Sequence, residues 1–393
     1  MRNGVSVGTV DGRETWLAVA EGLLSQPTAP LLEELPAAAV MAFAEARPGL
    51  SAGRDAAGNV VVRYEGEGAD LDRPLVLVAH LDHPGFAVSA VAGDTATLEF
   101  RGGLAAADAV AGSPVEFFRP GCAEAVGHGE LVAAEAHERR LKGATARVVD
   151  GAAEPGGFAM WRFPGFAVDD DRISGRVCDD LLGAAVVLCA LDELARRRPA
   201  GTAVWGLFTR AEEIGFLGAL EAIRLRTVPR RARVLSLECS KALADAPQGG
   251  GVIVRVGDRT SIFDPGLTAA LVRAAGEVAG ADPAFRWQRK LMDGGTCEAS
   301  AFCACGYQAS GLALPLGNYH NGLDRGAGVG PEHVRVDDYV AGVRLATELA
   351  LSPHLLDGAD GGDEPPAWLR RHQDRARAEL AADAPAALAA EKV

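Results

Sequence analysis

Short apolar runs alternate with longer segments of helical periodicity along most of the chain. Apolar residues recur every three or four positions in six segments that we expect to be helices: 14–24, 31–46, 184–197, 216–225, 265–279 and 336–351. Runs typical of buried strands cover residues 60–64, 75–79, 232–240 and 251–256, another begins at Ala203, and residues 309–321 are expected to form a strand and a loop. This alternation predicts an α/β fold, with a mixed, mostly parallel sheet and helices on both faces.

The pattern changes between residues 87 and 174. Short β-type runs separated by Gly, Asp and Pro lie at 95–101, 114–118, 146–149, 157–163 and 166–168. Without a long helical pattern, they predict a small inserted all-β domain. We therefore expect a discontinuous domain of residues 13–86 and 175–352, with residues 87–174 as the inserted domain. Residues 353–393, rich in Gly, Asp, Pro and then Ala, favour an exposed, partly helical or disordered tail.

Charge and composition exclude some kinds of binding partner and indicate a cellular compartment. The formal net charge of −14 argues against nucleic acid or an anionic membrane as a partner. We find no apolar run long enough to span a bilayer and no signal-peptide pattern near Met1. Seven cysteines without a disulfide-scaffold pattern fit a reducing compartment, so we expect a cytoplasmic protein.

Side chains that commonly bind metals follow several of the apolar runs. His80 follows residues 75–79, with Asp82 two positions later, and Asp179 stands with Asp180 where a helix would start. The remaining candidates are Glu212, Glu213, Glu238 and His320. Singly, each of these residues is better explained as a cap, a turn or a surface carboxylate. Because the carboxyl ends of parallel strands share one edge of a sheet, we expect these residues to converge there.

Two imidazoles and three carboxylates suit a pair of divalent ions: His80, Asp179, Glu213, Glu238 and His320. We expect Zn²⁺, with Co²⁺ or Mn²⁺ as alternatives. Such a pair shares a water and polarises a carbonyl. Glu212 would then be the general base. We find no Gly-x-Ser-x-Gly or Cys/His pattern that offers a rival nucleophile.

The order of the motifs resembles that of the di-zinc exopeptidases of the tetrahedral (TET) aminopeptidase family, which includes the glutamyl and deblocking aminopeptidases. The matching motifs, between about residues 14 and 351, are Ala79-His80-Leu81-Asp82, Asp179-Asp180, Glu212-Glu213-Ile214-Gly215, Gly294-Gly295-Thr296 and Tyr319-His320. Each of these five motifs is common by itself, but their occurrence in the same order is specific for the family.

The resemblance implies a role for each matching residue. His80, Asp179 and Glu238 would hold one ion, and Asp179, Glu213 and His320 the other. Asp82 would orient His80, and Glu212 would be the base. The resemblance further implies a cis peptide bond between Asp179 and Asp180, substrate binding by Gly294, Gly295 and Thr296, peptide substrates, and a dimer or dodecamer of identical chains.

The chain also departs from the family pattern. His83 stands where an acidic residue is usual and could compete for a metal ion, and Leu181 replaces a basic residue. Glu238 stands where Asp is commoner, Cys297-Glu298 follow Gly-Gly-Thr where Asp is common, and Asn321 replaces Ser. None of these changes removes a metal ligand, but together they leave the substrate preference open.

Three functions remain open at this point. The leading one is an aminopeptidase that removes N-terminal residues from peptides. A carboxypeptidase or amidohydrolase would keep the metal site and cleave a different bond. A non-catalytic homologue would serve as a binding or assembly protein.

Overall fold

The computed structural model describes residues 12–356 and 367–383. Its centre is an eight-stranded sheet in the order β1-β2-β12-β3-β13-β16-β14-β15. The four middle strands run parallel to one another: β12 (Ala203–Thr209), β3 (Leu75–His80), β13 (Arg233–Lys241) and β16 (Gln308–Leu316). Antiparallel pairs join β2 (Val60–Glu65) to β1 (Leu50–Arg54) and to β12, and β14 (Val252–Asp258) to β16, while β15 (Trp287–Met292) runs parallel to β14. The sheet is therefore mixed and mostly parallel, as expected.

Helices cover both faces of this sheet, because alternate strand residues point to opposite sides. Leu75, Leu77 and Ala79 pack on one side into a core with α1 (Gly12–Leu24), α2 (Glu34–Glu45), α3 (Leu181–Arg197), α5 (Pro265–Ala281) and α7 (Val336–Leu351). Val76 and Val78 pack on the other side with α4 (Leu217–Leu225) and α6 (Glu298–Ala304). These two cores confirm the predicted fold class.

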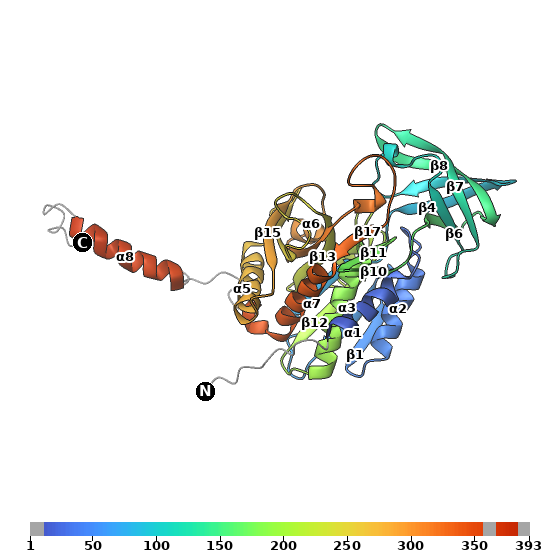
Figure 1. Cartoon of the computed structure of the whole chain (residues 1–393). Coiled ribbons are helices and arrows are strands. Elements are labelled where there is room, and N and C mark those ends of the chain that lie inside the picture. The colour runs from blue at the N-terminus through green and yellow to red at the C-terminus, as the bar shows by residue number, and fades with distance from the viewer. Residues whose placement is uncertain (1–11, 357–366, 384–393) are drawn as a thin grey trace.

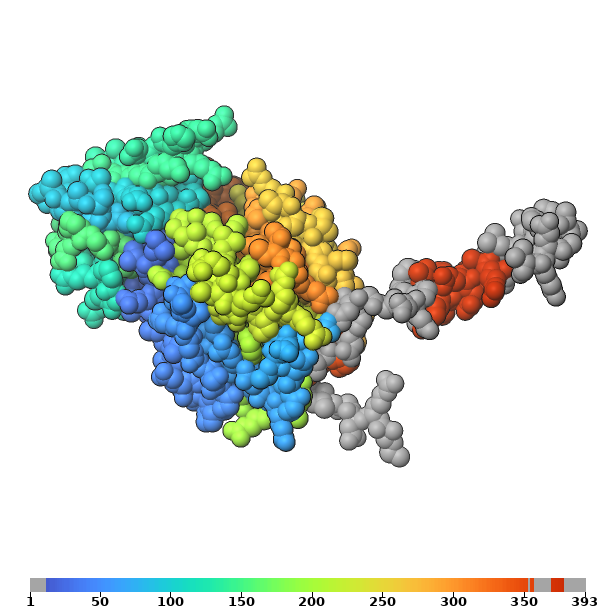
Figure 2. Space-filling view, turned by 180° about the vertical axis from the view of Figure 1, so that it is seen from behind, coloured from blue at the N-terminus to red at the C-terminus, as the bar shows by residue number. Residues whose placement is uncertain are grey.

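A closed β-barrel is inserted between β3 and α3. Its strands are β4 (Gly85–Ala92), β5 (Thr95–Arg101), β6 (Pro114–Phe118), β7 (Gly127–His137), β8 (Arg140–Gly151) and β9 (Phe158–Trp161), in the order β4-β5-β8-β7-β6-β9. A core of its own, including Phe86, Phe117 and Trp161, fills the barrel. Figure 1 shows the barrel beyond one end of the helix-covered sheet, and Figure 2 shows it from behind as a separate lobe.

The end of the expected insertion belongs to a different sheet. Strands β10 (Ala167–Asp169) and β11 (Arg172–Gly175) pair with β17 (Glu332–Arg335), far along the chain. This three-stranded sheet brings residues near 175 beside residues near 332. It therefore links the chain leaving the insertion to the segment that follows His320.

The six predicted helices are confirmed within a few residues, and β5 and β6 match their predicted ranges. Six of the strands in the described residues were not predicted: β1, β4, β7, β11, β15 and β17. Part of the expected tail, residues 357–366 and 384–393, lies outside the described residues, and α8 (Ala367–Asp383) lies in its described part. No helix among the described residues has both the length and the apolar character needed to cross a bilayer.

Candidate metal centre

The carboxyl ends of β12, β3, β13 and β16 lie at one edge of the sheet, where they bring most of the predicted ligands together. His80 is the last residue of β3, as expected. The other candidate ligands from β12 and β13 do not lie at the last residue of a strand. β12 ends at Thr209, so Glu212 and Glu213 lie in the turn beyond it, and Glu238 lies inside β13, whose ladder with β16 continues to Lys241.

Asp179 is the centre of the cluster. One carboxylate oxygen, Oδ1, lies 3.6 Å from His80 Nε2, and the other, Oδ2, lies 3.6 Å from His320 Nε2. His320 Nε2 also lies 3.1 Å from Glu213 Oε1. The peptide bond between Asp179 and Asp180 is cis, as expected. A single carboxylate therefore faces both imidazoles.

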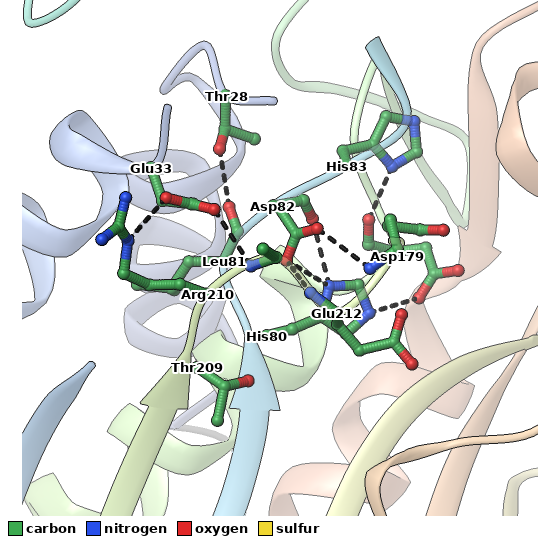
Figure 3. Close-up of polar contacts among 12 residues, drawn as sticks. Thr28, Glu33, His80, Leu81, Asp82, His83, Asp179, Thr209, Arg210 and Glu212 are labelled. Carbon is green, nitrogen blue, oxygen red and sulfur yellow. Dashed lines mark hydrogen bonds and ion pairs between the residues drawn. The ribbon is translucent and has the colours of Figure 1, made fainter. Parts of the chain in front are cut away.

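Two buried carboxylates fix the turn that carries Glu212 and Glu213. Asp82 accepts hydrogen bonds from the backbone N–H groups of Glu212 at 2.9 Å and Glu213 at 3.0 Å. Glu33 accepts from the backbone of Ala211 at 3.0 Å and from Arg210 Nε at 2.8 Å (Figure 3). Because the backbone on both sides is held, the two glutamates project from a defined turn.

Asp82 also lies beside His80. The His80 Nδ1–H donates to the backbone oxygen of Asp82 at 3.1 Å, and the Asp82 carboxylate lies 3.6 Å from the same nitrogen (Figure 3). A proton on Nδ1 leaves the Nε2 lone pair directed at Asp179. The main-chain oxygen of Asp82 accepts the hydrogen bond from His80, while its side chain accepts those from the backbone of Glu212 and Glu213.

Sequence reasoning missed Glu332, which holds two of the candidate ligands in place. Its Oε2 accepts from the backbone N–H groups of Cys178 at 2.7 Å and Asp179 at 2.9 Å, and its Oε1 accepts from that of His320 at 2.8 Å. Glu332 is fully buried at the start of β17. No motif marks this residue in the sequence, and only the pairing of β11 with β17 reveals its position.

The barrel contributes a contact to His320. Gly103, which follows β5, accepts a hydrogen bond from His320 Nδ1 through its carbonyl at 2.5 Å. A carbonyl can only accept, so the Nδ1 of His320 carries the proton and Nε2 is free to bind a cation. The inserted domain therefore sets the tautomer of a candidate ligand.

His83 is not available as a competing metal ligand. Its Nδ1 donates to the backbone oxygen of Asp179 at 2.7 Å, and its Nε2 lies 3.0 Å from the Asn321 side-chain oxygen. The Asn321 amide nitrogen donates to the carbonyls of Arg176 and Gly330. With both ring nitrogens engaged, His83 supports the backbone of Asp179.

Charges and burial shift the pKa values of this cluster. Burial alone would lower the pKa of His80, but Glu212, Asp179 and Asp82 outweigh it and raise that pKa well above its usual value. Burial would raise the pKa of Asp179, but the nearby imidazoles of His320 and His80 lower it. Without a metal, protons on the imidazoles therefore balance the carboxylates.

Other carboxylates of the cluster shift in the opposite direction. Burial raises the pKa of Glu238 to about 7, and Asp179 adds to this effect while His80 and Arg255 oppose it. Burial also raises the pKa of Glu212 well above its usual value, with further increases from Glu238 and Glu213. A carboxyl group with a raised pKa is suited to take up a proton near neutral pH.

Two further buried carboxyl groups lie at this edge and were not predicted as site residues. Glu298 is fully buried without a hydrogen-bond partner for either side-chain oxygen, and burial raises its pKa to about 8. Asp180, also fully buried with both oxygens unpartnered, has a pKa that burial raises well above its usual value. A Cβ on Gly183 would lie 2.2 Å from Asp180 Oδ1, so glycine leaves room for this carboxyl group.

The Gly294-Gly295-Thr296 segment forms an exposed turn ahead of Glu298. Asp258 accepts from the backbone of Cys297 at 3.0 Å, and the backbone N–H of Arg259 donates to the Gly295 carbonyl at 2.9 Å. The segment is thereby tied to the end of β14. Its predicted contact with substrate stays a prediction.

The donor set fits divalent cations. One donor atom each from His80, Asp179 and Glu213 lies within 4.8 Å of the others. Asp179 Oδ1 and Glu213 Oε1 are buried without a hydrogen-bond donor, which is costly unless a cation or proton compensates. Imidazole and carboxylate ligands suit Zn²⁺ and related ions.

Comparison with known families supports the resemblance found in the sequence. The model of the M42 glutamyl aminopeptidase family matches residues 143–325. No curated protein sequence matches the chain significantly.

Solved structures share the fold over most of the chain. An aminopeptidase, APDkam598, from the archaeon Desulfurococcus kamchatkensis superposes with a TM-score of 0.74 and 19% identity, covering 90% of this chain and 99% of its own. A TET aminopeptidase from the marine sediment archaeon Thaumarchaeota archaeon SCGC AB-539-E09 gives 0.73 and 18%, covering 88% and 99%. The Pyrococcus horikoshii TET1 peptidase, which assembles into a tetrahedron or a large octahedral shell, gives 0.69 and 19%, covering 85% and 99%. These likenesses confirm the fold, and with the family match they support a metal-dependent aminopeptidase.

Proposed function

We propose that this metal-dependent aminopeptidase removes N-terminal residues from peptides with a water activated between two divalent ions. The observation that carries the proposal is the position of Asp179, whose two oxygens each lie 3.6 Å from a different imidazole. His80 and Glu238 would complete one ion site, and Glu213 and His320 the other. Zn²⁺ is the proposed ion, with Co²⁺ or Mn²⁺ as alternatives.

When bound, the ions would lower the pKa of a shared water and polarise the scissile carbonyl. The residues of the chain would supply the proton transfers and the orientation. Glu212, on a turn fixed by Asp82 and Glu33, would accept the proton of the attacking water and deliver it to the leaving amine. Hydrogen bonds from the Nδ1 atoms of His80 and His320 to main-chain oxygens keep the Nε2 lone pairs available.

The proposal extends to location and assembly. All seven cysteines are free thiols, which supports a reducing compartment such as the cytoplasm. A homo-oligomer is proposed because the Pyrococcus horikoshii TET1 peptidase, which shares the fold, assembles into closed shells. The barrel would be a contact surface between copies or a lid. We further propose that the turn at Gly294, Gly295 and Thr296 contacts substrate, because it leads directly into the buried Glu298.

Metal analysis together with a substrate panel tests the proposal. The purified protein should contain two divalent ions per chain and cleave chromogenic aminoacyl substrates that have a free N-terminus. Cleavage of N-acyl amino acids or of C-terminal residues would instead indicate an amidohydrolase or a carboxypeptidase. Absence of metal, with no activity after Zn²⁺, Co²⁺ or Mn²⁺ is added, would indicate a binding protein.

A further inference from the structure

Tyr319, which precedes the candidate ligand His320, is one of four tyrosines in the chain. The hydroxyl groups of the other three each donate to a main-chain carbonyl, at 2.8 to 3.1 Å: Tyr64 to Pro199, Tyr307 to Val228 and Tyr339 to Trp16. The hydroxyl of Tyr319 has no hydrogen-bond partner among the residues that the structure describes. The Tyr319 side chain is partly exposed, so this hydroxyl remains a donor for a ligand.

The backbone beside Tyr319 is left-handed at three positions. The φ angle is 53° at Asn318, 55° at His320 and 62° at Asn321. Such angles are uncommon for residues other than glycine, and they are often found at functional sites. Asn318 is held in this conformation by two hydrogen bonds that it exchanges with Asp324, at 3.0 and 3.1 Å. The loop therefore holds Tyr319 in a defined position.

This backbone stacks the Tyr319 ring on the imidazole of His320. The two ring centroids lie 3.7 Å apart and the ring planes differ by 23°, whereas neighbouring side chains on an extended strand point in opposite directions. His320 Nε2 lies 3.1 Å from the Glu213 carboxylate and 3.6 Å from that of Asp179. The tyrosine ring therefore lies directly against the candidate metal ligands.

The carboxylates of the metal centre act on the Tyr319 hydroxyl. Burial raises the pKa of Tyr319 well above its usual value, and the charges of Asp179, Glu213 and Glu212 raise it further. Because electrostatic interactions weaken with distance, this effect agrees with a hydroxyl close to these groups. The hydroxyl keeps its proton at neutral pH and can therefore donate a hydrogen bond to an oxygen that gains negative charge.

We propose that the Tyr319 hydroxyl donates a hydrogen bond to the oxygen of the scissile carbonyl, a role that rests on the aminopeptidase function proposed above. When the oxygen of the attacking water bonds to the carbonyl carbon, the π electrons of the carbonyl move onto its oxygen. The proton of the water passes to Glu212 and then to the leaving nitrogen, as the C–N bond breaks and the carbonyl re-forms. Tyr319 keeps its own proton and is a catalytic residue that stabilises the negative charge.

The variant Tyr319→Phe of the metal-loaded, full-length protein tests the proposal, because phenylalanine keeps the stacked ring and removes only the hydroxyl. We expect kcat to fall about tenfold or more, with KM and metal content unchanged, since removing one donor of this kind costs about 10²–10³-fold in other enzymes. A phosphinic dipeptide analogue imitates the tetrahedral geometry, so its inhibition constant should rise about as much as kcat/KM falls. The inhibition constant of the product amino acid should not change.

The matched control is Tyr307→Phe, which removes a hydroxyl at the opposite end of β16 from His320 and should keep the natural kcat. A normal kcat in Tyr319→Phe would overturn the proposal. A fall in kcat that comes with lost metal, or that leaves phosphinic inhibition unchanged, would also overturn it, because the ring would then have a structural role. A natural chain that cleaves no peptide would contradict the aminopeptidase function itself, whereas an active natural chain with an unaffected Tyr319→Phe would contradict only the role of Tyr319.

Discussion

The carboxylate of Glu332 accepts a hydrogen bond from the backbone N–H of Asp179 at 2.9 Å, although 153 positions separate the two residues. Its other oxygen accepts from His320 at 2.8 Å. The Glu332 side chain thus fixes the backbone of two candidate ligands, Asp179 and His320. Glu332 would therefore affect metal binding through the positions of these two residues.

Replacing Glu332 by Gln should weaken metal binding. A glutamine keeps one acceptor oxygen, so its NH₂ group would face a backbone N–H donor on one side. Losses of about 10–100-fold in metal affinity are typical when such supporting groups are changed. Chelator competition would measure the Zn²⁺ affinity, with Glu277→Gln on the exposed face of α5 as control. Unchanged affinity in Glu332→Gln would contradict a supporting role.

Replacing Glu212 by Gln should abolish hydrolysis and leave the metals bound. The amide cannot accept the proton of the water, and loss of a general base typically costs about 10²–10⁴-fold in rate. Glu221→Gln, at a residue on α4 that pairs with Arg224, is a control expected to retain activity. Stopped assays and metal analysis of the same preparation would show both effects. Normal turnover by Glu212→Gln would remove the proposed base.

Metal affinity should fall as the pH is lowered through about 7. Burial raises the pKa of Glu238 to about 7, so its carboxylate is fully available only above that pH. Below it a proton competes with the ion, which costs up to about tenfold in affinity per pH unit for one proton. Protons on His80, whose pKa is also raised, add to the effect. Zn²⁺ titrations between pH 5.5 and 8.5 would measure this slope, and a flat profile would be inconsistent with a proton on Glu238.

Replacing Glu298 by Gln should stabilise the metal-free protein at alkaline pH. Burial raises the pKa of Glu298 from 4.5 to about 8, so between these values the folded state keeps a proton that the unfolded state has released. The free energy of unfolding then falls as the pH rises, by up to about 1.4 kcal/mol per pH unit, and levels off above about 8. Urea unfolding from pH 5 to pH 9 should show this fall in the natural chain and a smaller one in Glu298→Gln.

The exposed substitution Glu277→Gln serves as control for this comparison as well. If the free energy of unfolding of Glu298→Gln fell with pH as steeply as that of the natural chain, groups other than Glu298 would cause the fall.

The sequence predicted the parts of the site that depend on chain order. The apolar runs that end near His80 and His320 are β3 and β16, two parallel strands on either side of β13, so their carboxyl ends lie at the same edge of the sheet. The details around Glu212 and Glu238 were not predictable in this way. A strand ends where its hydrogen-bonded ladder ends, and β13 continues past Glu238 because β16 lies beside it.

Residues whose role comes from distant pairing left no signal in the sequence. Glu332 begins the four-residue strand Glu-His-Val-Arg, which has little apolar pattern, and its partner strand β11 lies some 160 residues earlier. β15 has the mixed sequence Trp-Gln-Arg-Lys-Leu-Met at an edge of the sheet, where one side needs no apolar cover. Glu298 and Asp180 stood in predicted motifs, but only their burial shows that they belong to the charged cluster.

The hydrogen bond from His320 to the Gly103 carbonyl limits how this enzyme can be dissected or recombined. A shortened catalytic half, or a chimaera carrying another protein's barrel, would keep every predicted ligand and still lose the acceptor that selects the imidazole tautomer. The barrel and the catalytic domain are therefore not independent modules. A barrel taken from a relative would work here only if its loop placed a carbonyl where that of Gly103 now accepts from His320.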